Sequence, residues 1–140
     1  MNDLSWVASV RFVHQRANHC REYCYTCQQI IGQAMHVDHI DPHGSDNPDN
    51  LCLSCPNCNQ SKARAIVAID PDTNETVTLF NPRTQTWSEH FTWIDGGRRL
   101  RGLTTVGRAT IERLKINQDR VVIAWELWIS AGNHPPRSVR

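Results

Sequence analysis

The chain has 140 residues, 39% of them hydrophobic, which is enough for one compact domain with a modest core. Its formal net charge of +1 excludes binding of nucleic acid through a strongly basic overall field, so phosphate contacts have to come from local clusters. No segment approaches the ~20 consecutive apolar residues that span a bilayer, and the N-terminal segment lacks the apolar stretch of a secretory signal. We therefore predict a single cytoplasmic domain over residues 1–140, without membrane contact.

The N-terminal residues 3–18 are predicted to form an amphipathic helix. Apolar side chains recur there at spacings of three and four residues: Leu4, Val7, Ala8, Val10, Val13 and Ala17. Polar residues such as Arg11 and Gln15 fall elsewhere on the helix surface. The expected role of this helix is to cover the core.

Between residues 20 and 62 cysteine, histidine, asparagine and proline dominate, and regular periodicity is brief. We expect a bound metal, more than buried apolar area, to hold this part together. Residues 34–40 alternate as a strand does, and residues 42–50 are rich in turn formers and predict a loop. Residues 58–68 contain no Gly or Pro and are predicted to be helical.

The C-terminal residues 66–140 are predicted to form an extension of hairpins and helix. Short strands are expected at residues 66–69, 76–80, 91–94 and 100–103, separated by turn residues, and they indicate two hairpins. Residues 107–131 follow with broadly helical spacing, a break near Asn117 and a stop at Gly132. We expect the aromatic residues of this last segment to lie in the core.

Two Cys-x-x-Cys pairs, Cys24 with Cys27 and Cys55 with Cys58, are separated by a stretch long enough to fold back on itself. Each pair places two thiolates on one side of a tight turn, and two such turns supply the four sulfur ligands that Zn²⁺ binds tetrahedrally. Because four protein ligands leave no position for water, we predict a structural zinc site.

The sequence leaves some cysteine roles open. Cys20 is an alternative to Cys27, since Cys20 and Cys24 could also bracket a metal. Buried free thiols or a redox pair are the other interpretations of the paired cysteines. Cys52 lies between two leucines and is expected to be a small core residue.

Three phrases in fixed order carry a family resemblance. Residues 36–42 read HVDHIDP, residues 48–51 read PDNL, and residues 55–62 read CPNCNQSK. This order resembles the HNH endonuclease family in its zinc-knuckle form. The resemblance implies an α+β fold with a ββα-metal (His-Me finger) core at residues 16–65, a structural zinc site, an N-terminal helix and an accessory C-terminal region at residues 66–140.

The resemblance also implies roles by position. His39 matches the general base, and Asp38 and Asn59 match the protein ligands of one catalytic ion. Asn50 matches the middle asparagine, which fastens the loop to the hairpin and orients the histidine. Lys62 matches a basic residue one turn into the helix, suited to binding a phosphate of the substrate.

The chemistry of phosphodiester hydrolysis independently explains why these residue types would be needed. An imidazole, with a reference pKa of about 6.5, can take a proton from the attacking water at neutral pH, which suits His39. Oxygen ligands such as the Asp38 carboxylate and the Asn59 amide suit a hard divalent ion, so we predict catalytic Mg²⁺ or Mn²⁺ beside the structural zinc.

Two geometric conditions follow for the site. Adjacent residues of a regular strand point to opposite faces, so Asp38 and His39 need a local bend, bulge or strand end to act on one phosphate. The loop at residues 42–50 is shorter than the glycine-rich loop associated with the family, and Asn50 must still reach His39 across it. His36 lies on the same alternating face as Asp38, but like His43 it is interpreted as a surface or loop residue.

We therefore predict an endonuclease that cuts DNA, with a homodimer as the arrangement that would best suit a double-strand cut. The alternative is a catalytically inactive zinc-knuckle module that binds nucleic acid or protein. A local basic concentration could neutralise DNA phosphates, although a solvated hairpin tip is an equal interpretation: Arg98, Arg99, Arg101 and Arg108.

Overall fold

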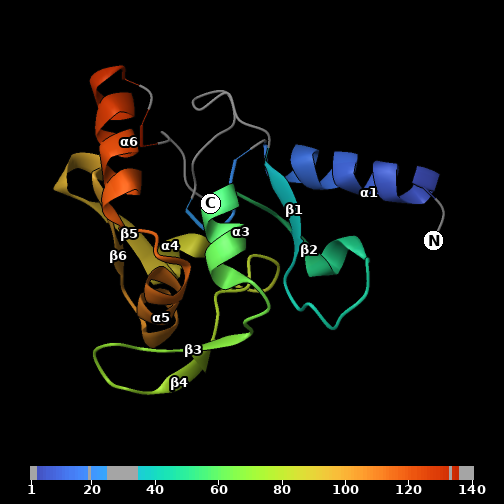
Figure 1. Ribbon diagram of the computed structural model, residues 1–140, viewed down its shortest axis with the longest axis horizontal. Coiled ribbons are helices and arrows are strands. Elements are labelled where there is room, and N and C mark those ends of the chain that lie inside the picture. The colour runs from blue at the N-terminus through green and yellow to red at the C-terminus, as the bar shows by residue number, and fades with distance from the viewer. Residues whose placement is uncertain (1–2, 19, 25–34, 133, 136–140) are drawn as a thin grey trace.

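The computed structural model describes residues 3–18, 20–24, 35–132 and 134–135. Within them helices alternate with small antiparallel sheets, which confirms the predicted α+β class. Figure 1 shows α1 (Asp3–Arg16) on the right-hand side of the molecule and α6 (Asp119–Ser130) on the left-hand side. No helix in these ranges is long and apolar enough to cross a membrane.

The sheets of the described chain are all two-stranded hairpins: β1 pairs with β2, β3 with β4, and β5 with β6. Each pair joins strands that are neighbours in sequence, so register is set locally by the intervening turn. Between α1 and α6 the elements follow in the order β1 (His36–His39), the 3-10 helix η1 (Pro48–Asn50), β2 (Leu51–Ser54), α3 (Pro56–Lys62), β3 (Val67–Ile69), β4 (Thr76–Thr78), α4 (Trp87–His90), β5 (Phe91–Ile94), the 3-10 helix η2 (Asp95–Gly97), β6 (Arg99–Gly102) and α5 (Thr105–Leu114).

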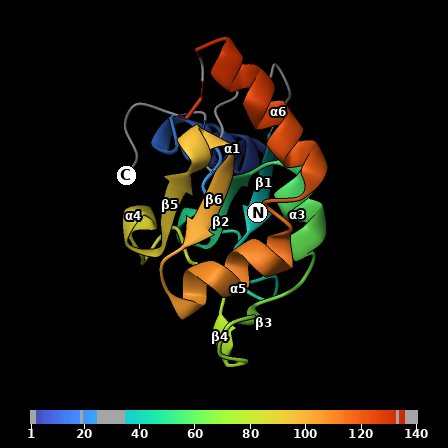
Figure 2. The same ribbon diagram turned by 90° about the vertical axis from the view of Figure 1, so that its left-hand side faces the viewer.

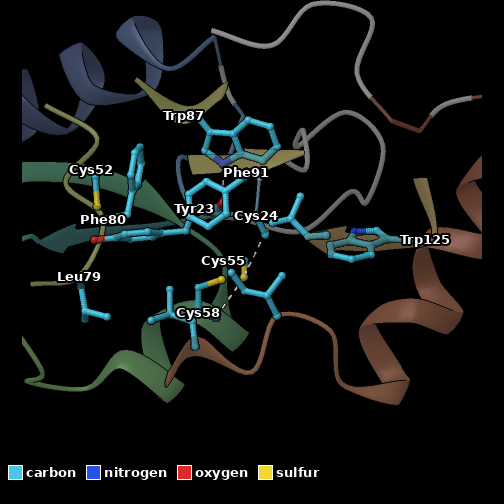
Figure 3. Packing of buried hydrophobic residues seen from close by; sticks show 13 residues of the cluster. Tyr23, Cys24, Cys52, Cys55, Cys58, Leu79, Phe80, Trp87, Phe91 and Trp125 are labelled. Atoms are coloured by element: carbon cyan, nitrogen blue, oxygen red, sulfur yellow. Dashed lines mark hydrogen bonds between the residues drawn. The ribbon is translucent and has the colours of Figure 1, made fainter. Parts of the chain in front are cut away.

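The hairpin of β1 and β2 separates two groups of buried side chains. Its register is regular and pairs Asp38 with Cys52 and His39 with Leu51. Leu51 and Leu53 join a small core beneath α1 that includes Val13. Cys52 belongs to the larger core, drawn in Figure 3, which extends to the C-terminal elements. The alternation of side chains along a strand thus gives the hairpin one face toward each core.

The C-terminal hairpins are joined to the rest of the fold through α5. This helix packs against β6 on one side and β3 and β4 on another, as Figure 2 shows. A Cβ atom at Gly107 would lie 2.1 Å from the carbonyl oxygen of His90, so the close approach of α5 requires glycine there. The buried Asp70 carboxylate accepts hydrogen bonds from Arg108 Nε at 2.9 Å and Nη2 at 2.8 Å, which ties β3 to α5.

Most predicted elements are present, and the largest difference in bounds is at α3. The helix predicted at residues 58–68 is instead α3, which ends at Lys62 because Ala63 adopts a positive φ of 48°. The predicted break near Asn117 is confirmed, because its side-chain amide bonds the backbone of Leu100 at 2.8 and 2.7 Å and α6 starts only at Asp119. The short helix α4 was not predicted.

Candidate active site and metal centre

Three buried thiols converge at the start of α3. The sulfur atoms of Cys24, Cys55 and Cys58 all lie within 4.8 Å of one another, and those of Cys24 and Cys55 are 3.9 Å apart. A tetrahedral cage with zinc–sulfur bonds of about 2.3 Å has neighbouring sulfurs about 3.8 Å apart. Figure 3 shows this group enclosed by aromatic side chains of the larger core. The donor set and its spacing therefore fit a thiophilic ion.

Local structure presents these sulfurs. Cys55 caps α3, and its sulfur accepts a hydrogen bond from the backbone nitrogen of Cys58 at 3.1 Å, which turns both thiols to one side. The hydrogen bond with Cys24 and burial raise the pKa of the Cys55 thiol to about 12. A bound cation would hold the group as thiolates. Arg21 adds positive charge, since it is 8% exposed and donates from Nη1 to Cys24 Sγ at 3.8 Å.

The three-cysteine group does not show whether Cys27 or Cys20 supplies the fourth ligand. Cys27 lies outside the described residues, and Cys20 is described but is not part of the three-cysteine group. The sulfur of Cys20 is instead part of a disulfide and lies 3.4 Å from the carbonyl oxygen of Asn18. The expectation for Cys52 is confirmed, because its side chain is completely buried in the core.

On the α3 face of β1, Asp38 lies opposite Lys62. The carboxylate oxygen Oδ2 of Asp38 is 3.5 Å from Lys62 Nζ, and the two side chains are 13% and 1% exposed. Among the described residues this Oδ2 is buried without a hydrogen-bond partner. Burial raises the pKa of Asp38, while the ammonium of Lys62 and the backbone N–H of His39 oppose the rise. Apart from the ammonium of Lys62, no described group is paired with this buried oxygen, which is of the type that binds a hard divalent cation.

Lys62 is held below the surface. Its Nζ also donates to the carbonyl oxygen of His39 at 3.0 Å, so it ties the end of β1 to α3. The phosphate contact predicted for Lys62 would require substrate to reach the bottom of the site beside Asp38. In its present position the ammonium neutralises a buried carboxylate.

Asn59 lies one turn before Lys62 on the same side of α3, and it contacts β1 through His36. The amide nitrogen Nδ2 of Asn59 is 3.4 Å from His36 Nδ1, at an exposed position. His36 and Asp38 share a face of β1, and Asn59 and Lys62 share a face of α3, so the two expected ion ligands belong to facing elements. The structure thus brings His36 to the site.

His39 points to the other face of the hairpin, toward α1. Its Nε2 lies 2.7 Å from Oδ1 of Asp46 in the loop between β1 and β2. Its ring stacks on that of Trp6 in α1, with centroids 6.3 Å apart and an interplanar angle of 13°. The imidazole is therefore fixed both at one edge and across one face.

The loop at residues 42–50 is closed by Asn50. Its Oδ1 accepts from the backbone nitrogen of Asp41 at 2.9 Å, and its Nδ2 donates to the carbonyl oxygens of Asp41 at 3.0 Å and Ser45 at 2.9 Å. The backbone nitrogen of Ile40 donates to the Asn50 carbonyl at 2.8 Å. Asn50 fastens the loop to the hairpin, and the contact to His39 is made by Asp46.

The regular strand places Asp38 and His39 on opposite faces, and no bend or bulge interrupts their register. Within the described chain β1 pairs with β2 alone, and Glu22 covers the other side of β2 through its backbone hydrogen bond to Leu53. No described strand pairs with the far edge of β1, and side chains from both faces of β1 can border the space along this edge. His39 is the last residue of β1, so the strand end, one of the features that the sequence analysis required here, falls at this residue.

Sequence reasoning missed two neighbours of His39. Trp6 was interpreted only as part of a covering helix, and Asp46 only as a loop residue. A carboxylate seven residues after a histidine gives no periodic signal, and the Trp6 contact depends on how α1 packs. Both could be found only from the three-dimensional arrangement.

Comparison with known proteins gives a match to a family model. Residues 20–64 match the family model described as HNH endonuclease, which confirms the family resemblance of the motifs. The matched segment includes the three-cysteine group, the hairpin of β1 and β2, and α3. No curated protein and no solved structure matches the chain. HNH proteins are nucleases that use divalent metal ions and act on DNA, so the match supports an enzyme of this broad class.

Proposed function

We propose that the HNH endonuclease match at residues 20–64 marks a metal-dependent enzyme that hydrolyses DNA phosphodiester bonds. The observation that carries the proposal is the Asp38 carboxylate, which has a buried oxygen without a hydrogen bond beside α3. A purely structural zinc module has no need of a second set of ligands next to its cysteines.

The cysteine group takes the structural role in this proposal. Cys24, Cys55 and Cys58 would hold Zn²⁺, with Cys27 or, once its disulfide is reduced, Cys20 as the fourth ligand. Cys55 caps the N-terminus of α3, so the bound ion would hold Cys24 against the start of this helix. Zinc would thereby hold in register the elements that carry Asp38 and Asn59.

Asp38 and Asn59 are the proposed ligands of the catalytic ion, the arrangement of a ββα-metal core. A bound Mg²⁺ or Mn²⁺ would supply positive charge to the phosphate oxygens and the leaving oxygen. One charged and one neutral protein ligand leave most of that charge uncompensated. Lys62 stands beside the same carboxylate and is proposed to contact phosphate only from the bottom of the site.

His39 is the proposed general base, and it would take a proton from the attacking water at its free ring nitrogen. Its place along the edge of β1 with which no described strand pairs allows substrate to lie between it and the face that carries Asp38. Asn50 is proposed to act by closing the loop that borders His39.

The test is cleavage of supercoiled plasmid by the wild type, His39→Ala and His43→Ala, with EDTA, Mg²⁺ or Mn²⁺. Loss of a general base should lower the rate about 10²–10⁴-fold in His39→Ala. The variant at the exposed His43 controls for loss of an imidazole elsewhere in the loop and should cleave normally.

Equal rates for wild type and His39→Ala would remove His39 from this role. Well-folded wild type that cuts no form of DNA would favour the inactive zinc-knuckle module, in which Lys62 permanently neutralises Asp38. Nicked circles as the first product indicate action by single subunits, whereas direct linearisation would indicate a homodimer.

A further inference from the structure

We propose that Asp46 is a positioning residue for His39, which it holds in one tautomer and orientation; this rests on the proposed nuclease function. The distance of 2.7 Å between Asp46 Oδ1 and His39 Nε2 is that of a short hydrogen bond between side chains. Asp46 lies in a loop whose resemblance to the family assigns a role only to Asn50.

The chemistry of the pair determines which nitrogen is available. An ionised carboxylate can only accept a hydrogen bond, so Nε2 of His39 must carry the proton that it donates to Asp46. In the neutral ring Nδ1 then keeps its lone pair. Among the described residues none hydrogen-bonds Nδ1, so this atom is the one available to receive the proton from water. A carboxylate that fixes the tautomer in this way also stabilises the imidazolium formed afterwards.

The loop is built to hold Asp46 in place. The carbonyl oxygen of Ser45, the residue just before it, accepts from Asn50 Nδ2 at 2.9 Å. On its other side Asn47 caps η1, because its side chain accepts from the backbone nitrogen of Asp49 at 2.9 Å. Gly44 lies so close to this amide that a Cβ there would be 2.6 Å from Asn50 Nδ2. Asn50 therefore acts on His39 indirectly, by fixing the backbone that presents Asp46.

Trp6 restrains the remaining freedom of the ring. Its indole lies nearly parallel to the imidazole, at an interplanar angle of 13°, and limits rotation out of that plane. The helix that carries Trp6 is anchored at its end, where Arg16 donates to the carbonyl oxygens of Pro48 at 3.0 Å and Leu51 at 2.7 Å. These hydrogen bonds join α1 to both ends of η1, so they fix the position of Trp6 relative to the loop that carries Asp46.

A bare surface ion pair is the competing explanation. The side chains of His39 and Asp46 are 35% and 45% exposed, and exposed pairs contribute only about 0–1 kcal/mol to stability. Such a pair would leave the tautomer and the rate of reaction unaffected by its loss. Only a positioning role predicts a change in both.

The experiment compares Asp46→Ala and Asp46→Asn with Asp49→Asn, a control at an exposed acidic residue of the same loop. Long-range ¹⁵N NMR of the full chain reports which ring nitrogen of His39 carries the proton, with the signal assigned from His39→Gln. Plasmid cleavage with Mg²⁺ or Mn²⁺ reports kcat and KM separately.

The wild type should show the Nε2–H tautomer, and Asp46→Ala should show a mixture. The same variant should lose about 10–100-fold in kcat with KM unchanged, the range for residues that orient a functional imidazole. Asp46→Asn keeps an uncharged acceptor oxygen, so its kcat and tautomer population should lie between those of the wild type and Asp46→Ala. Asp49→Asn should behave as wild type.

A wild-type rate and tautomer in Asp46→Ala would overturn the proposal while the nuclease function stands. If the wild type cleaves no DNA, the tautomer alone decides: its loss in Asp46→Ala supports positioning by Asp46, and its persistence refutes it. If both Asp46 variants lose the same amount of stability but keep the wild-type kcat and tautomer, the contact is only a surface ion pair.

Discussion

His134 should make the stability of this protein depend on pH through the larger core. The ring is 5% exposed and lies between Trp93, at 4.6 Å and an angle of 84°, and Trp125, at 5.4 Å and 11°. Burial lowers the pKa of His134 to about 4, and the Gly97 carbonyl and the Cys24 thiolate only partly oppose this. Acidification should therefore destabilise the fold before ordinary carboxylates are protonated.

The sign and size follow from proton linkage. The unfolded imidazole binds protons near its ordinary pKa of 6.5, and the folded one only near about 4, so the unfolded state binds more protons in between. Full stability is present above pH ~6.5 and is lost as pH falls. The difference corresponds to about 2 kcal/mol at pH 5 and at most about 3.4 kcal/mol at still lower pH.

The assay is urea unfolding of the wild type and His134→Phe between pH 8 and pH 5. Phenylalanine can keep the ring packing against Trp93 and Trp125 but does not titrate. The free energy of unfolding should fall about 2 kcal/mol further for the wild type than for the variant over this range. Parallel pH dependence of the two proteins would show that His134 is not held neutral by the core, and would refute the reasoning.

Two further predictions concern the metal centre and the packing of α5. Cys55→Ser should abolish zinc binding and lower the melting temperature, whereas Ser at the equally buried Cys52 should leave zinc content intact; equal zinc in both would refute the cage. Gly107→Ala should destabilise the fold by about 1–3 kcal/mol in urea unfolding, because its Cβ would meet the His90 carbonyl at 2.1 Å. An increase in stability, as expected from alanine's helix propensity alone, would contradict that packing.

The sequence predicted the parts of the fold that depend on local signals. The strand at β1, the hairpins of the C-terminal region and the break at Asn117 all have turn residues or periodicity to mark them. The end of α3 was misplaced, because no Gly or Pro stands between Lys62 and β3 to mark it. The helix was terminated instead by Ala63 in a left-handed conformation, which residue type does not predict.

The candidate site was predictable in composition more than in arrangement. The sequence pattern alone proposes Asp38, His39 and Asn59, because their residue types and spacing resemble the family. The partners of these residues could not be read in the same way. From its residue type alone, Lys62 would be expected at the surface. It is instead buried against Asp38, because the face of α3 that carries it packs on β1.

Strand alternation places the proposed base, His39, and the proposed ion ligand, Asp38, on opposite faces of one hairpin. Asp38 and His39 are contacted from different sides. Lys62 of α3 contacts Asp38, whereas Asp46 of the loop and Trp6 of α1 contact His39. Lys62 reaches His39 only at its backbone carbonyl, whereas Asp46 and Trp6 contact the ring. Asp46→Ala should therefore alter the His39 ring without altering ion binding at Asp38. In the proposed site a phosphate would lie between the Asp38 half and the His39 half, along the edge of β1 with which no described strand pairs.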